Sequence, residues 1–192
     1  MSAAIFAAAF LFLAGLAGAA DPEAGGEKAQ VCVACHGPGG NSSNPAVPSI
    51  SGQPAQFIST ALFMFRGGDR KDPQMSPMAA NLSNDDINNL AAYFSAQIPA
   101  PPAHDTRPEN LRAGSALANK LNCTQCHNRN LRGQQHIPRI AGQQFEYLRA
   151  QLRGFRAGTR ADFDGNMTSA AQAVGEKDLE VLADYLAGLA PR

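Results

Sequence analysis

Apolar residues follow a helical spacing in several stretches of this chain of 192 residues. The stretch 54–65 carries apolar side chains every three or four positions and is followed by Gly67 and Gly68, which predicts an amphipathic helix with a glycine stop. Its apolar face consists of Phe57, Ile58, Ala61, Leu62 and Phe65. The same spacing recurs later in Phe145, Leu148, Leu152 and Phe155. Both stretches are therefore predicted to be helices that bury one face.

A second pair of apolar stripes lies nearer the end of each half of the chain. Ser83 followed by Asp86 is spaced as in an N-terminal capping box, and an apolar stripe follows at 87–94. The stretch 179–189 carries the matching stripe, although Gly175 stands where the serine would be and predicts a weaker cap. Because no stretch alternates apolar and polar residues as a strand would, the predicted fold class is all-α.

The first twenty residues form a segment of a different kind. Positions 3–20 contain no charged residue, and small residues precede Asp21, as at the cleavage site of a secretory signal peptide. The basic residues expected at the start of such a peptide are missing. Residues 1–20 are therefore predicted to be a signal peptide, with a retained anchor as the alternative, and both predict export.

The rest of the chain is an internal repeat. The sequence Cys32-Val33-Ala34-Cys35-His36 recurs 91 positions later as Cys123-Thr124-Gln125-Cys126-His127. Further matched pairs are Pro48 with Pro138, Gln53 with Gln143, Phe65 with Phe155, Arg70 with Arg160, Met75 with Met167 and Tyr93 with Tyr185. The chain thus consists of two copies of one structural unit.

The repeat defines two predicted domains. The N-terminal domain is assigned to residues 21–98 and begins with Asp21, Pro22 and Glu23, which is a helix start signal. A proline-rich linker is assigned to residues 99–106, because its prolines favour an extended chain and stop the preceding helix. The C-terminal domain is assigned to residues 107–192.

Composition and length exclude several classes of function. A hydrophobic content of 44% and a charged content of 17% are ordinary for a soluble protein, and the formal net charge of zero argues against nucleic-acid binding. The chain is too short for a large Rossmann or barrel enzyme.

The net charge of zero nevertheless conceals an unequal distribution of charge between the two halves of the chain. Residues 21–100 hold seven acidic against four basic residues, whereas residues 101–192 hold nine against twelve. Fields of opposite sign can attract different partners.

Each repeat contains Cys-x-x-Cys-His, the attachment signature of c-type haem. Two thiols three positions apart on a helical turn can add to the two vinyl groups of one porphyrin, and the next residue can bind its iron. Two covalent haem c groups are thus predicted on Cys32, Cys35, Cys123 and Cys126, with His36 and His127 as proximal ligands. A porphyrin would also supply the apolar centre that so small a domain lacks, so each domain without haem is expected to be poorly folded.

Three other uses of the cysteines fit the sequence less well. Disulfides within each pair would close very short loops and would leave the histidines unexplained. A four-cysteine zinc site normally has its pairs about 15 to 20 residues apart, whereas these pairs are 91 residues apart. A thioredoxin-like redox pair needs a βαβ context, which the apolar pattern lacks.

The second axial ligand decides between electron transfer and chemistry at the iron, because an open position would admit peroxide or another small ligand. Met167 is the one methionine of the second repeat. In the first repeat Met75 occupies the matching position, and Met78 lies three residues out of register. Met75 and Met167 are therefore predicted as axial ligands, with Met78 as the alternative to Met75.

Three further side chains are given structural roles. Met64 aligns with Gly154 inside a predicted helix and is expected to fill a gap in the core. His104 lies in the linker and is expected to be solvated. His136 precedes Pro138 by two residues and is expected to be a surface loop histidine, with axial ligation or a contact to a haem propionate as alternatives.

Residues 21–192 resemble the dihaem cytochromes c of the cytochrome c4 type. The resemblance rests on the two Cys-x-x-Cys-His motifs, the paired Gly-Gln elements, the Phe-Arg-x-Gly-x-Arg segments, and a methionine before the last helix of each repeat. It implies two tandem class I cytochrome c-like domains, each wrapped around one covalent haem c. It also implies that the carbonyls of Pro48 and Pro138 accept the proximal histidine N–H groups. Proteins of this type are periplasmic electron carriers, often membrane-associated, that donate to terminal oxidases.

The function predicted from these features is electron transfer rather than catalysis. Thioether ligation raises the reduction potential, which suits a periplasmic carrier between a donor such as a quinol-oxidising complex and a terminal oxidase. The alternative is a dedicated electron-accepting subunit of a periplasmic dehydrogenase. A dihaem peroxidase is a third reading, against which the short chain and the two methionines argue. The expected partners are redox proteins, with peripheral membrane association left open and no nucleic acid.

Overall fold

The computed structural model of this chain describes residues 19–191, so nearly all of the predicted signal peptide lies outside the described residues. In this range the regular elements are all helical, and the one β-type pairing is an isolated bridge between Gln134 and Ile137. The all-α prediction is thereby confirmed for residues 19–191. None of the helices in that range is long and apolar enough to cross a membrane.

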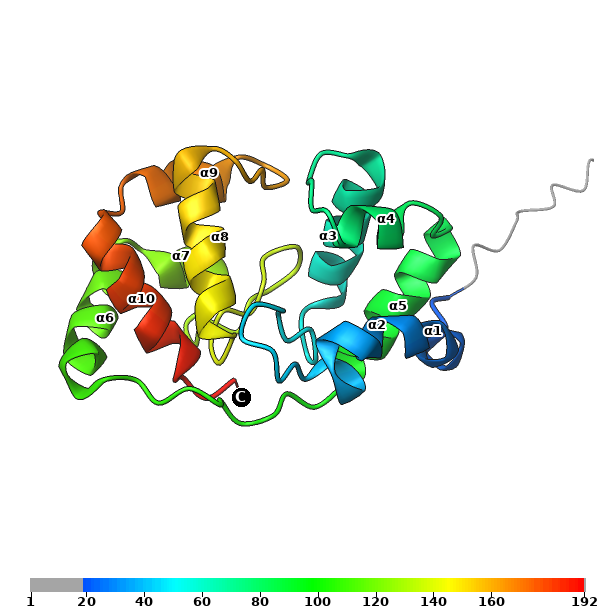
Figure 1. The fold of residues 1–192 in the computed structure, drawn as a ribbon, viewed down its shortest axis with the longest axis horizontal. Helices are drawn as coiled ribbons and strands as arrows, with labels where there is room; N and C mark the ends of the chain where they lie inside the picture. The colour runs from blue at the N-terminus through cyan, green and yellow to red at the C-terminus, as the bar shows by residue number, and fades with distance from the viewer. Residues whose placement is uncertain (1–18, 192) are drawn as a thin grey trace, which may run out of the picture.

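The helices form two lobes of matching architecture (Figure 1). The first contains α1 (Pro22–Lys28), α2 (Gln30–His36), the 3-10 helix η1 (Pro38–Gly40), α3 (Ala55–Gly67), α4 (Met75–Ala79) and α5 (Asn84–Ala96). The second contains α6 (Pro108–Lys120), α7 (Cys123–His127), α8 (Phe145–Ala157), α9 (Asn166–Gln172) and α10 (Glu176–Ala187). In each lobe the last helix packs against the first helix and against the long middle helix.

The helix boundaries follow the local signals in the sequence. The carboxylate of Asp21 accepts hydrogen bonds from two backbone N–H groups at the start of α1, and Ser83 and Asp86 form a complete capping box at the start of α5. Gly175 begins α10 without a side-chain cap, as predicted. Helices α3 and α8 each end at a glycine in the left-handed conformation, Gly68 and Gly158.

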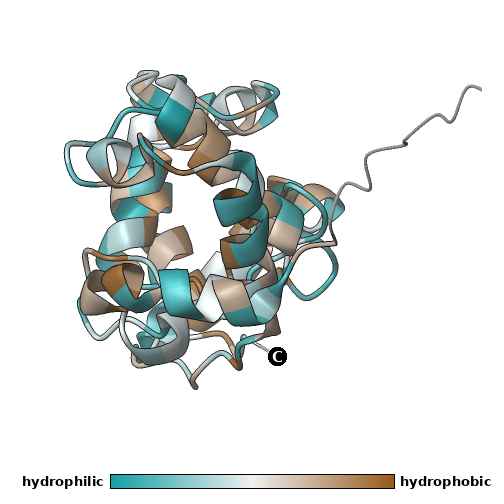
Figure 2. Ribbon diagram, turned by 90° about the vertical axis from the view of Figure 1, so that its right-hand side faces the viewer, coloured by the Kyte–Doolittle hydropathy of each residue, from teal (hydrophilic) through white to brown (hydrophobic). Residues whose placement is uncertain are grey.

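The predicted apolar stripes form the cores. Ile87, Leu90 and Phe94 of α5 are buried, and Leu179, Leu182 and Leu186 of α10 are their counterparts. Figure 2 shows polar and apolar residues sharing each helix, as an amphipathic pattern requires. The stripes on the last helix of each lobe therefore organise its packing.

A glycine allows the first and last helices of each lobe to approach closely. A Cβ atom added to Gly25 would lie 2.1 Å from the carbonyl oxygen of Asn89, and one added to Gly114 would lie 2.2 Å from Cβ of Tyr185. Both distances are too short for any side chain. The matched residues Tyr93 and Tyr185 thus pack against Gly25 of α1 and Gly114 of α6.

The linker is held more firmly than the sequence suggested. His104 was expected to be solvated, but its Nε2 lies 2.9 Å from Oδ1 of Asp184 and its ring stacks on Phe145 with centroids 4.9 Å apart. Asp184 is 2% exposed, and it also accepts hydrogen bonds from Arg107 and Asn110. Burial raises the pKa of Asp184, but the hydrogen bonds from Asn110 and His104 outweigh it and hold this pKa below its usual value. The prediction for His104 was wrong because a buried carboxylate needs donors, and the linker supplies them.

The prediction for Met64 was also wrong. Its side chain is half-buried and lines a surface hollow with Thr60, Phe63 and Phe163, instead of filling a gap in either core cluster of the described residues. The sequence placed Met64 correctly inside a helix, but one position away from the buried Phe65.

The crossing of α6 and α10 generates a test of the fold. Replacing Gly114→Ala is expected to lower the free energy of unfolding of the haem-loaded protein by about 2 kcal/mol, because the added methyl group forces the helices apart. Denaturant titration followed by circular dichroism measures this change. Gly67→Ala is the matched control, since the equivalent residue in the second repeat is Ala157 and the new methyl group meets only the flexible side chain of Asp69. Equal stability of the two variants would contradict the close crossing.

Candidate haem-binding sites

The two predicted proximal histidines end short helices in the same way. His36 closes α2 and His127 closes α7, and each is followed by a residue with positive φ, Gly37 at 77° and Asn128 at 70°. Both imidazoles are buried, with 6% and 7% exposure. The turn therefore directs each imidazole ring into the interior of its lobe.

A proline carbonyl fixes the orientation of each ring. Nδ1 of His36 lies 2.8 Å from the carbonyl oxygen of Pro48, and Nδ1 of His127 lies 2.8 Å from that of Pro138. Since a carbonyl only accepts, Nδ1 carries the hydrogen and Nε2 is the nitrogen left for a metal. Burial lowers the pKa of both histidines, and the proline hydrogen bonds oppose this shift. Both rings are therefore held neutral, as metal ligands must be.

The cysteines lie on the same turns as the histidines. Cys32 and Cys123 are half-buried, Cys35 and Cys126 are exposed, and no two of the four are joined in a disulfide. Burial raises the pKa of Cys32 and of Cys123. Residues 19–191 contain no group of three or more His, Cys, Asp or Glu side chains that could hold a metal ion, which argues against a four-cysteine zinc site. Each lobe thus has one half-buried cysteine and one exposed cysteine on the turn that carries its histidine.

The predicted methionines lie at the starts of α4 and α9, each anchored by an aspartate. The backbone N–H of Met75 donates to Asp72 Oδ1 at 2.8 Å, and that of Met167 donates to Asp162 Oδ2 at 2.8 Å. Both methionines are half-buried, whereas the alternative Met78 is 48% exposed. These aspartates were not among the predicted site residues, although each stands two residues after the matched Arg70 or Arg160.

Two arginines provide a test of whether a haem fits. Among the described residues, Nε of Arg139 and Nε of Arg160 are buried without a hydrogen-bond partner. Burial lowers the pKa of each to about 10, so both remain cationic at neutral pH. Buried cationic donors need anionic partners, and the propionates of a haem are carboxylates. Both arginines belong to the second repeat, and the donor set of that lobe thus fits a haem.

The apolar side chains around the core of the first lobe also fit a haem. In the first lobe the fully buried cluster is small and is surrounded by partly buried apolar side chains, among them Val33, Ile50, Phe57 and Leu62. A porphyrin contacting these side chains would remove their remaining apolar surface from water.

The position of His136 is compatible with its predicted place in a loop between α7 and α8, where it contacts Asp164 and Phe163.

The loops that follow the two prolines also join the lobes. The side chain of Gln143 accepts from the N–H of Ser49 at 2.7 Å and donates to its carbonyl at 2.8 Å. Gln53 makes the reciprocal pair with the backbone of Arg139, at 2.8 and 3.0 Å. Both glutamines are buried. Because the same positions of the two repeats exchange the same bonds, the interface is self-complementary, as in a two-fold dimer.

Further contacts extend this interface beyond the glutamines. The N–H of Tyr147 donates to the carbonyl oxygen of Pro45 at 3.1 Å. Arg70 donates to the hydroxyl of Tyr147 at 3.1 Å. Burial raises the pKa of this tyrosine, but the charges of Arg70 and Arg160 outweigh it and lower the pKa. Matched basic residues of the two repeats therefore converge on one aromatic side chain between the lobes.

Comparison with known proteins agrees with this architecture. Residues 20–94 match the family described as cytochrome c oxidase, cbb3-type, subunit III, and residues 111–190 match the family described as cytochrome c. The chain is 37% identical to cytochrome c4 of Azotobacter vinelandii, an alignment that covers 93% of this chain and 94% of the relative. The chain belongs to the cytochrome c4 family.

Related structures and sequences agree with the family assignment. The crystal structure of reduced recombinant cytochrome c4 from Pseudomonas stutzeri superimposes with a TM-score of 0.82 at 34% identity, covering 89% of this chain and all of that one. A thiosulfate dehydrogenase electron acceptor from Thiomonas intermedia is 32% identical over 88% of this chain and 81% of its own length. As a member of this family the chain consists of two tandem cytochrome c domains with covalent haem c, and it is an electron-transfer protein, not an enzyme.

The reciprocal glutamines generate a second prediction. Gln53→Ala should lower the free energy of unfolding of the haem-loaded protein by about 2 kcal/mol, because it leaves the buried N–H and carbonyl of Arg139 without partners. The exposed Gln56 is a control in the same domain, and its replacement by alanine should change stability by less than about 0.5 kcal/mol. Urea titration of both variants measures the difference, and equal midpoints would show that the glutamine bonds do not hold the lobes together.

Proposed function

We propose that Cys32, Cys35, Cys123 and Cys126 attach the two haems, and that the irons are ligated by His36 with Met75 and by His127 with Met167. The observation that carries this proposal is the repetition of one arrangement in both lobes: a buried histidine bonded to a proline carbonyl, and a half-buried methionine anchored by an aspartate. We also propose the domain extents 21–98 and 107–192, separated by a linker at 99–106.

The roles of the protein groups follow from this assignment. Bound haem iron supplies one-electron chemistry. The prolines fix the tautomer and ring plane of each histidine, and the aspartates hold the backbone N–H of each methionine. Arg139 and Arg160 offer their free Nε atoms to the propionates. None of these groups has to move or to transfer a proton, which suits a carrier of electrons.

We propose that the carrier works in the periplasm between a donor such as a quinol-oxidising complex and a terminal oxidase. Covalent haem c and methionine ligation support this choice, because a thioether ligand raises the reduction potential into a range that an oxidase can accept. Peripheral association with the membrane would bring the carrier close to both partners.

A second candidate is the electron-accepting partner of a periplasmic dehydrogenase. The similarity to a protein named thiosulfate dehydrogenase electron acceptor favours it. The two functions differ in what reduces the protein: a quinol-oxidising complex in the first case, and a purified sulfur-compound dehydrogenase with its substrate in the second. Stopped-flow reduction with each donor distinguishes them.

Removal of each methionine tests the ligand assignment. Met75→Ala and Met167→Ala should each open one axial position, so that the reduced protein binds about one carbon monoxide per two haems. The wild type should bind none. Met78→Ala is the matched control, because Met78 is exposed. Its replacement should leave the axial positions of both irons closed. Carbon monoxide titration followed by the Soret band gives the stoichiometry, and binding to Met78→Ala with none to Met75→Ala would reverse the assignment in the first domain.

A further inference from the structure

The segment that leads to the methionine is longer in the second repeat than in the first. Met75 follows Asp72 by three positions, whereas Met167 follows Asp162 by five. The added length produces an exposed stretch at 163–166, which contains a glycine with positive φ, while the first repeat has a proline in its shorter segment. Ordering a longer stretch that contains glycine costs more conformational entropy. An additional contact therefore stabilises this segment more than it would the first.

His136 makes such a contact. Its Nε2 lies 3.3 Å from Oδ2 of Asp164, and its ring packs edge-to-face with Phe163 at a centroid distance of 5.8 Å. Since a carboxylate only accepts, Nε2 of the histidine carries the hydrogen. In the part of the chain that the structure describes, this is the one hydrogen bond between residues 161–165 and any segment other than α9. His136 is thus the polar attachment of this stretch to the rest of the lobe.

The turn that carries His136 is itself firmly held. Gln134 and Ile137 exchange two backbone hydrogen bonds, of 3.0 and 2.8 Å, on either side of it. The residue before the histidine has a φ of 52°, which is uncommon for a residue other than glycine. The N–H of Gly133 donates to the carbonyl oxygen of His127 at 2.8 Å. The turn is thereby tied to the end of α7, where the proximal histidine lies.

From these contacts we infer that His136 is a positioning residue for Met167, the ligand proposed for the second iron. His136, Phe163 and Asp164 form what we name the methionine strap, which joins the turn after α7 to the segment before α9. The inference rests on the proposed function, because it takes Met167 as the axial ligand. By holding the two segments together, the strap keeps the thioether where it closes the axial position.

Hydrogen bonds carry the restraint from the strap to Met167. Asp164 accepts from the backbone N–H of Asn166 at 3.2 Å and from the side-chain amide of the same residue at 2.7 Å. Asn166 directly precedes Met167, whose own N–H donates to Asp162 at 2.8 Å. Without His136, the aspartate bonded to Met167 would be the remaining anchor of the segment.

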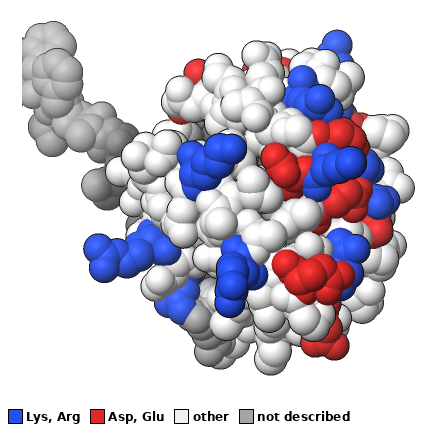
Figure 3. Space-filling view, turned by 90° about the vertical axis from the view of Figure 1, so that its left-hand side faces the viewer, with Lys and Arg blue, Asp and Glu red and all other residues white. Residues whose placement is uncertain are grey.

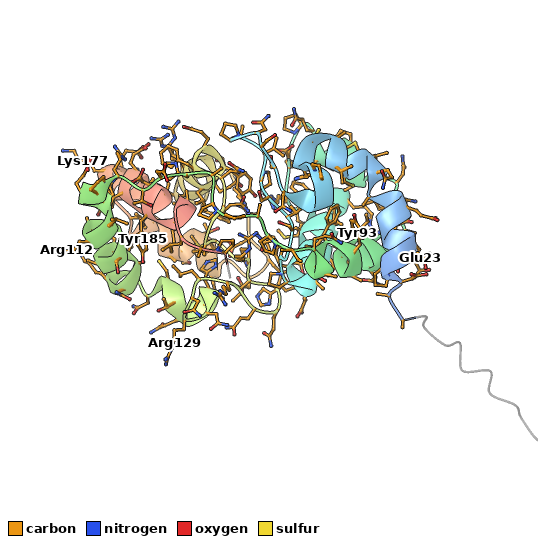
Figure 4. All side chains as sticks on the ribbon, turned by 90° about the horizontal axis from the view of Figure 1, so that it is seen from below. Glu23, Tyr93, Arg112, Arg129, Lys177 and Tyr185 are labelled. Carbon is orange, nitrogen blue, oxygen red and sulfur yellow. The ribbon has the colours of Figure 1, made fainter. Side chains whose placement is uncertain are left out.

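The ion pairs of the second lobe do not replace the strap. They join Arg149, Arg153 and Arg156 of α8 to Glu146, Glu176 and Glu180. Figure 3 shows acidic and basic side chains side by side at this end of the molecule, and Figure 4 places Arg112 and Lys177 at its outer edge. Among residues 19–191, none of the α8 pairs reaches the segment 159–166. The methionine segment is therefore held independently of this network.

The first lobe has no equivalent of the strap. Ala46 stands two residues before the proline, at the position that matches His136. Within the described residues, no side-chain hydrogen bond joins 41–54 to 68–79. Loss of the strap should therefore affect the second haem alone.

The test measures how fast imidazole, which competes with a methionine ligand, binds the oxidised haem-loaded protein. The parent protein carries Met75→Ala, so that the first iron binds imidazole in a fast phase and a slow phase reports the second iron. We expect His136→Ala to accelerate the slow phase about tenfold, because the loop loses its bond to a carboxylate. The far-red absorption band of methionine-ligated ferric haem should weaken in parallel. His136→Gln keeps a donor for Asp164 and should bring the rate back to within about threefold of the parent.

His104→Ala is the matched control, because His104 lies against the same lobe, bonds to the carboxylate of Asp184 and stacks on a phenylalanine. It should lower stability and leave the slow phase within about twofold of the parent. Equal slow phases in His136→Ala and the parent, or equal acceleration by the two alanine variants, would overturn the strap. A slow phase that disappears entirely in His136→Ala would also overturn it, since the histidine would then itself be the ligand. Absence of a slow phase in the parent would instead count against ligation by Met167, and so the two failures are distinguishable.

Discussion

The hydrogen bond from each proximal histidine to a proline carbonyl is the contact on which the rest of the structure depends. Pro48 and Pro138 each accept from a buried imidazole at 2.8 Å, and the residue after each proline joins the two lobes through its own backbone. One short loop in each repeat therefore has two tasks. It sets the tautomer of a histidine, and it makes half of a reciprocal interface. A change in the packing of the lobes would therefore reach each histidine through one peptide unit, the one that follows its proline.

This arrangement explains why the two repeats match at the interface between the lobes and differ on their outer surfaces. The inner loops must satisfy buried backbone groups in both directions, so Gln53 and Gln143 occupy matching positions and make matching bonds. No such demand acts on the outer surfaces. There the two repeats differ, with an uncharged stretch at 29–65 and a basic stretch at 110–145. A duplicated domain can in this way keep one internal geometry while its outer surfaces diverge.

Much of the fold was predictable from the sequence, because the repeat shows each signal twice. The capping box at Ser83, the glycine stops at Gly68 and Gly158, and the all-α class follow from local rules that do not depend on distant contacts. The family is likewise readable from Cys-x-x-Cys-His together with matched positions. The ligand assignment stays a prediction, although the geometry of both lobes supports it.

The features that the sequence did not predict depend on long-range contacts between polar groups. His104 and the buried Asp184 are 80 residues apart, and Asp184 has no acidic counterpart in the first repeat to draw attention to it. The aspartates beneath Met75 and Met167 are spaced differently from their methionines in the two repeats, since two residues are inserted in the second. Alignment by the methionines alone therefore leaves the aspartates out of register.

Closure of the haem iron by histidine and methionine in both lobes is what distinguishes a carrier of electrons from a protein with an open iron. A potentiometric titration of the mature haem-loaded protein, followed by haem absorbance with and without carbon monoxide, tests it most directly. We expect two one-electron centres, both with positive potentials and both unaffected by carbon monoxide. A centre of markedly negative potential, or a haem that binds carbon monoxide, would contradict it.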